Sequence, residues 1–192
     1  MSTEALEPYL RALLEENQKL NLTGIRDLEQ ARVLHVLDSL AIAGLGLAPT
    51  SCLDLGTGNG FPGVALRVLF PDAEVTLIDR TAKKLDAIQR ALEVAQLRGI
   101  STVHVDAAIA RRTHPELLAR FDLIAVRAVG RPAAVAALAA PLSTADGQLV
   151  LWLDEGTEPP ETLPDFAFVA AHDYELPQPA SRRRRLALYA AR

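Results

Sequence analysis

The chain has 192 residues, of which 49% are hydrophobic, so it is long enough for one domain with a sizeable core. Twenty Lys and Arg residues against 24 Asp and Glu residues give a net charge of −4, which excludes a generally basic nucleic-acid binder but not a local basic patch. Its single cysteine, Cys52, excludes an internal disulfide framework and a multi-cysteine zinc site. No apolar run is long enough for a membrane span and the start has no signal-peptide pattern, so we expect a cytoplasmic protein.

The first part of the chain predicts two helices. Leucines recur near helical spacing over residues 4–20. Asp27 is expected to cap a second helix, with Gln30 as its capping-box partner, and this helix runs to about Ala43. The predicted division of the chain is a helical extension over residues 1–48 and one compact domain over residues 49–192.

After residue 48 the pattern alternates between strand and helix. Five apolar runs predict strands at 51–55, 74–79, 101–106, 121–127 and 147–153, and helical stretches are expected at 63–70, 82–97 and 131–142. Residues 154–164 are rich in Pro and Gly and indicate a loop, and two consecutive strands, 166–176 and 183–191, then predict an antiparallel pair. This order is typical of an α/β protein with a mostly parallel, seven-stranded sheet and a C-terminal antiparallel hairpin, the Rossmann-like class I methyltransferase fold.

A glycine-rich loop, Asp54-Leu55-Gly56-Thr57-Gly58-Asn59-Gly60, follows the first strand. Glycines let the main chain approach a ligand closely, and ligands of open α/β sheets bind at the carboxyl ends of the strands. The G-x-G-x-x-G pattern of dinucleotide binders fails when counted from Gly56, although a shifted match from Gly58 survives. We expect the glycines at 56, 58 and 60 to bind the cofactor, and a carboxylate at Asp54 suits the amino group of S-adenosylmethionine.

Two further acids follow predicted strands. Asp79 ends the second strand, where an acid accepts hydrogen bonds from ribose hydroxyls, and Asp106 ends the third, where it could receive an adenine amino group. An ordinary turn-forming Asp is the alternative for each. Three acids at one edge of the sheet favour a cofactor site.

Several motifs resemble those of the RsmG (GidB) family, the bacterial guanine-N7 methyltransferases of 16S ribosomal RNA. The most specific segment is the glycine loop with its Phe61-Pro62-Gly63 continuation, and Asn17, His35 with Asp38-Ser39-Leu40, and Arg127-Ala128 also fit. The resemblance implies that S-adenosylmethionine is bound by Gly56, Phe61, the main chain at Ala107 and Ala108, and Arg127.

The chain departs from the family pattern at three places. Glu16 stands where the family has an aromatic residue, Asp106-Ala107-Ala108 where it has Arg-x-Glu, and Asp154-Glu155-Gly156 where it has Lys-Gly. Cofactor binding is therefore better supported by the sequence than methylation of the family's usual base.

The implied reaction needs no general base, because guanine N7 carries a free lone pair and no proton. Arg127 follows an apolar strand and is expected to project toward the methyl group as the catalytic residue. A structural role at the sheet end is the alternative for Arg127, and a local hydrogen-bonded set with Asp38 and Ser39 is the alternative for His35. The candidate contacts to RNA are His35, Lys83, Arg131, Arg184 and Arg185.

The sequence predicts a monomeric enzyme that binds no metal and whose partner is 16S ribosomal RNA or the small ribosomal subunit. Two alternatives stay open: a methyltransferase acting on another RNA or a small molecule, and a non-catalytic RNA- or ribosome-binding module on the same fold. A nicotinamide-dependent dehydrogenase is disfavoured by the glycine spacing and by the terminal hairpin.

Overall fold

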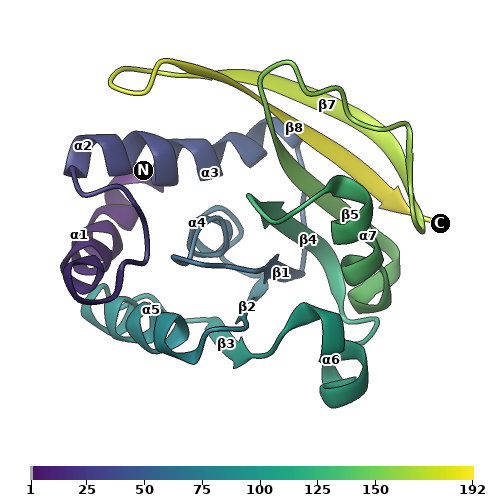
Figure 1. Cartoon of the computed structure of the whole chain (residues 1–192), viewed down its shortest axis with the longest axis horizontal. Helices are drawn as coiled ribbons and strands as arrows, with labels where there is room; N and C mark the ends of the chain where they lie inside the picture. The colour runs from purple at the N-terminus through teal and green to yellow at the C-terminus, as the bar shows by residue number, and fades with distance from the viewer. Residues whose placement is uncertain (1) are drawn as a thin grey trace.

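A computed structural model describes residues 2–192 and has one twisted sheet at its centre (Figure 1). In this range the strands run β3-β2-β1-β4-β5-β8-β7-β6 across the sheet. Their bounds are β1 (Ser51–Leu55), β2 (Glu74–Asp79), β3 (Ile100–His104), β4 (Phe121–Arg127), β5 (Ser143–Asp154), β6 (Thr162–Leu163), β7 (Phe166–Leu176) and β8 (Arg182–Ala191).

The first five strands are parallel to one another, and β8 pairs antiparallel with both β5 and β7. The expected parallel sheet with an antiparallel hairpin is confirmed. The expected number of strands, seven, is wrong, because a two-residue strand, β6, pairs with β7 inside the segment predicted as a loop. A strand this short leaves no alternating pattern in the sequence.

Helices cover both faces of the sheet. They are α1 (Ser2–Leu20), a continuous helical run made of α2 (Leu28–Ala31), a π-helical segment (Arg32–Leu37), α3 (Asp38–Leu40) and a 3₁₀ turn (Ala41–Leu45), then α4 (Gly63–Leu69), α5 (Ala82–Val94), α6 (Ala107–Thr113) and α7 (Pro132–Ala139). The Asp27 cap is confirmed, because its Oδ1 accepts from the Gln30 amide at 2.8 Å. Among the described residues, no helix is long and apolar enough to cross a membrane.

The third predicted strand is too long, and one helix was not predicted. β3 ends at His104, and Asp106 instead caps α6 by accepting from the amide of Ala108 at 2.9 Å. The pattern Asp-Ala-Ala is a helix start, and an acid after an apolar run is ambiguous between a strand end and such a cap.

Alternation along the strands divides the interior into two apolar clusters. In β4, Leu123 and Ala125 point into the cluster shared with α1, α4 and α5, whereas Ile124 and Val126 point into the cluster shared with α6 and α7. Arg127 is the next residue on the first of these faces. The strand therefore directs it toward the N-terminal helices.

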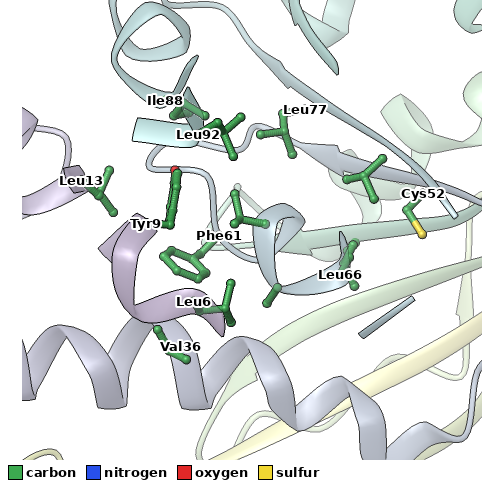
Figure 2. Close-up of a cluster of buried hydrophobic side chains, with 14 of the residues drawn as sticks. Leu6, Tyr9, Leu13, Val36, Cys52, Phe61, Leu66, Leu77, Ile88 and Leu92 are labelled. Atoms are coloured by element: carbon green, nitrogen blue, oxygen red, sulfur yellow. The ribbon is translucent and has the colours of Figure 1, made fainter. Parts of the chain in front are cut away.

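The N-terminal helix α1 is part of the main core. Its buried side chains recur at helical spacing and pack on α4 and α5; they are Leu6, Tyr9, Leu10 and Leu13. Figure 2 shows Tyr9 beside Phe61 of the glycine loop, and their ring centroids lie 5.5 Å apart. The Tyr9 hydroxyl donates to the carbonyl of Asn59 at 2.9 Å. The N-terminal helix thus supports the glycine loop from its buried side.

Candidate active site

The glycine loop connects β1 to α4 and is tied to the end of β2. The amides of Gly56 and Thr57 donate to the carbonyl of Ile78 at 3.0 and 2.9 Å. The Asp79 carboxylate accepts from the amide of Gly58 at 3.0 Å, and its other oxygen accepts from the amide of Thr81 at 2.8 Å. The loop and the acid at the strand end therefore form one hydrogen-bonded unit.

Gly58 presents an open face to solvent. Its φ is +60°, a conformation that favours glycine, and a Cβ atom built there meets nothing nearer than 3.9 Å. Gly60 differs, because a Cβ atom there would lie 2.0 Å from the Tyr9 hydroxyl oxygen. Gly58 thus leaves room for a ligand, whereas the glycine at 60 is required by the core.

A cleft of about 410 Å³ lies over this unit. It brings together residues of the glycine loop, the N-terminal helical run, β4 and β8. The lining residues used below are Gly56, Gly58, Phe61, Asp79, Lys84, Arg127, His35, Asp38, Arg182 and Arg184.

Asp54 lies beneath the loop and its carboxylate does not line the cleft, so its expected contact with a ligand's amino group stays a prediction. It is 1% exposed, and its Oδ2 accepts from the Thr57 hydroxyl at 2.7 Å and from the Gly63 amide at 2.8 Å. Burial raises the pKa of Asp54 to about 6, although these two hydrogen bonds and Arg127 act against the rise. Asp54 holds the loop in shape.

Arg127 binds the N-terminal helical run. Its Nη1 donates to Asp38 Oδ2 at 3.0 Å and to the Leu34 carbonyl at 3.1 Å, and its Nη2 donates to the Phe61 carbonyl at 3.3 Å. The side chain of Arg127 is 10% exposed and that of Asp38 is 2% exposed. Arg127 therefore lines the cleft in a fixed orientation.

Asp38 is the centre of a buried polar network that the sequence did not reveal. Its carboxylate also accepts from the Tyr174 hydroxyl at 2.6 Å and from Arg184 Nη2 at 3.3 Å, and its carbonyl accepts from Trp152 Nε1 at 2.9 Å. These partners come from β5, β7 and β8. The only sequence signal was a set of polar residues interrupting an apolar helix face.

His35 is buried between Phe61 and the loop. Its ring stacks on that of Phe61 with centroids 5.9 Å apart. Its Nε2 lies 3.1 Å from the Thr23 hydroxyl, and its Nδ1 lies 3.3 Å from Asn59 Nδ2. Burial, reinforced by the charge of Arg127, lowers the pKa of His35 to about 4. The imidazole is therefore neutral near pH 7.

The chain matches the family model described as rRNA small subunit methyltransferase G, GidB, over residues 2–158. The chain belongs to the GidB family. Relatives named Ribosomal RNA small subunit methyltransferase G come from Desulfitobacterium hafniense, 37% identical over 139 residues, and Streptococcus agalactiae serotype Ia, 33% identical over 147 residues. The matches cover 72% and 75% of this GidB-family chain and 57% and 62% of those relatives, so the chain spans about three fifths of their length.

Solved structures support the class I methyltransferase fold for this GidB-family chain. A mutant of MtNAS in complex with S-adenosylmethionine has a TM-score of 0.62 at 11% identity and covers 95% of this chain and 73% of its own. TrmN from Thermus thermophilus has a TM-score of 0.58 at 19% identity and covers 82% of this chain and 48% of its own. The predicted fold class is confirmed.

Several predicted site residues lie outside the cleft of this family member. Asp106 is exposed at the start of α6, and Ala107 and Ala108 line a separate hollow of about 660 Å³. Lys83 and Arg131 are exposed and do not line the cleft, and Arg185 is paired with Asp173 at 2.6 Å on the other face of β8. The adenine contact predicted for Asp106 and the main-chain cofactor contacts implied for Ala107 and Ala108 stay predictions.

Proposed function

We propose that the chain transfers a methyl group from S-adenosyl-L-methionine to N7 of a guanine in 16S ribosomal RNA. The observation that carries this proposal is the open main-chain face at Gly58 beside Asp79, at the carboxyl ends of two parallel strands in a GidB-family chain. Its curated relatives carry the name of a small-subunit ribosomal RNA methyltransferase.

The residues present fit this cofactor. A cleft of about 410 Å³ is within the range of small-molecule sites, roughly 300–1,000 Å³. Asp79 already accepts two amide hydrogen bonds, and a carboxylate has about four acceptor positions, so it keeps capacity for ribose hydroxyls. The loop main chain at Gly58 offers the close approach that a ligand needs.

The bound cofactor supplies an activated methyl group on a sulfonium. The chain's own task is to hold the guanine in line, because N7 has no proton to remove. His35 is neutral and its nitrogens are engaged by Thr23 and Asn59, which suits a structural role beside the site. Arg127 keeps donors beyond its bonds to Asp38 and the main chain, and these can hold guanine O6 or a phosphate.

We expect a monomeric enzyme, and methyl transfer to a free lone pair requires no metal ion. A ribosomal substrate implies action in the cytoplasm. Analytical ultracentrifugation and activity in the presence of a chelator test the first two statements.

The deciding experiment is tritium transfer from labelled S-adenosylmethionine to small ribosomal subunits that lack N7-methylguanine, with mapping of the labelled nucleotide. We expect label on a single guanine N7. Transfer is expected to be lost in Arg127→Ala and retained in Arg112→Ala, an exposed arginine outside the cleft.

Two other outcomes assign other functions. Cofactor binding by calorimetry without label on the subunits indicates a different substrate, which the replacement of the family's Arg-x-Glu by Asp106-Ala107-Ala108 favours. Absence of both label and cofactor binding leaves a binding module on the same fold.

A further inference from the structure

Two cations that line the cleft pair with no other group of the described residues. Lys84 lies in the first turn of α5 and Arg182 at the start of β8, and both line the cleft. Within residues 2–192, neither side chain makes a hydrogen bond or an ion pair. Long charged side chains from two separate elements thus line one hollow, and no carboxylate of residues 2–192 pairs with either of them.

Strand alternation selects Arg182 from the run of four arginines. Arg182 and Arg184 share the face of β8 that carries Leu186, whereas Arg183 and Arg185 lie on the opposite face. Arg184 is engaged by Asp38 at 3.3 Å and by Asp154 at 2.7 Å. The arginine that is both on the cleft side and unpaired is therefore Arg182.

The cleft is positively charged on an acidic chain. Its lining holds four cations, Lys84, Arg127, Arg182 and Arg184, against the two carboxylates of Asp38 and Asp79. The net charge of this lining is +2, whereas the whole chain carries −4. A concave site with a local excess of one sign concentrates ligands of the other sign, so the cleft favours an anion.

We infer that Lys84 and Arg182 bind backbone phosphates of the RNA next to the target guanine. This inference rests on the proposed function and names the residues that bind the RNA substrate. Arg offers a planar fork that fits phosphate oxygens, and Lys offers a compact point charge. Two such groups on different elements of the cleft hold the strand while its base enters the site.

The test compares Lys84→Gln and Arg182→Gln with Arg183→Gln, which removes the same charge one residue away on the opposite face. Lys83→Gln decides between the neighbouring lysines of α5. The measurements are the KM and kcat of methyl transfer to small subunits, the affinity for a single-stranded RNA fragment by anisotropy at several salt concentrations, and cofactor affinity by calorimetry.

We expect Lys84→Gln and Arg182→Gln each to raise the KM for RNA about tenfold, with kcat and cofactor affinity unchanged. Each loss should also reduce the slope of log affinity against log salt by about 0.7 to 0.9. Arg183→Gln should leave these quantities at the wild-type values, and Lys83→Gln should change them less than Lys84→Gln does, because Lys83 does not line the cleft.

Equal losses in Arg183→Gln and Lys83→Gln would overturn the inference, because the effect would then belong to the surface charge as a whole. A matching loss of cofactor affinity in the cleft variants would also overturn it and assign both cations to the cofactor carboxylate. If the wild-type protein binds RNA through Lys84 and Arg182 but transfers no methyl group, the proposed function is contradicted and this inference stands. If the wild-type protein does not bind RNA, both the proposed function and this inference are overturned.

Discussion

Replacing Asp38 by asparagine removes the buried negative charge that pairs with both Arg127 and Arg184. The carboxylate is 2% exposed, and the two guanidinium side chains are 10% and 15% exposed. Asparagine keeps the size of the side chain and an acceptor for the Tyr174 hydroxyl. The substitution therefore isolates the electrostatic part of the network.

The expected loss is large because two cations stay buried. Breaking a buried ion pair by removing one partner costs about 3–5 kcal/mol, most of it from the charge left behind. For a chain of this size, 1 kcal/mol corresponds to a shift in melting temperature of about 2–4 °C. Asp38→Asn should therefore lower the melting temperature by about 6–20 °C.

Asp154→Asn is the matched control, because Asp154 pairs with the same Arg184 but is 84% exposed. Exposed ion pairs contribute about 0–1 kcal/mol, so this variant should unfold close to the wild type. Urea unfolding followed by circular dichroism measures both. Where Asp38→Asn is too unstable to measure, adding Arg127→Gln should restore part of the loss, since it removes an uncompensated charge.

Equal unfolding free energies for Asp38→Asn and Asp154→Asn would refute this reasoning. The same holds if Arg127→Gln adds its full single-variant cost to that of Asp38→Asn, because independent losses mean that the two groups do not interact.

Four other variants test the loop and its surroundings. Gly60→Ala should destabilise the fold strongly, because its Cβ would lie 2.0 Å from the Tyr9 hydroxyl oxygen. Gly58→Ala should mainly weaken cofactor binding, measured by calorimetry, and should cost about 1–2 kcal/mol of stability because the φ of this residue is +60°. Burial raises the pKa of Asp54 from 3.8 to about 6, so the wild type loses stability as Asp54 ionises between pH 4 and 6. Asp54→Asn lacks this ionisation, so over the same range its free energy of unfolding in urea should rise by up to about 3 kcal/mol relative to the wild type. The pH dependence due to His35 has the opposite sign, because folding lowers its pKa from 6.5 to about 4 and the unfolded chain therefore binds the extra proton. The wild type should gain about 3 kcal/mol of stability as the pH rises from 4 to 6.5, and His35→Gln should not show this gain. A flat difference between variant and wild type over these windows contradicts either assignment.

The sequence was informative wherever local pattern decides structure. Apolar alternation gave the bounds of β1, β2, β4 and β7 as the structure has them, and the Asp27 cap followed from a local motif. The glycine loop and Asp79 were predicted as one site because parallel strands end at a common edge, and the structure joins them by a hydrogen bond of 3.0 Å.

Contacts between distant segments could not be predicted in the same way. Asp54 and Asp79 both end strands, but Asp54 lies beneath α4 and only Asp79 reaches the cleft. The choice of Lys84 over Lys83 depends on how α5 is rotated on the sheet, which the chain sets through tertiary packing. Strand alternation could have identified the face of Arg127 from Leu123 and Ala125, yet its partner is 89 residues away in the chain.

The network around Asp38 also has a consequence for the order of folding. Its hydrogen bonds reach Tyr174 and Arg184, which are 136 and 146 residues further along the chain. Contacts of such long sequence separation form late, since a long loop must close before they contribute. During synthesis the N-terminal helices and the first strands are made before the arginines of β8 leave the ribosome. We therefore expect the cleft to acquire its final shape as the last step of folding, when the β7–β8 hairpin docks beside β5.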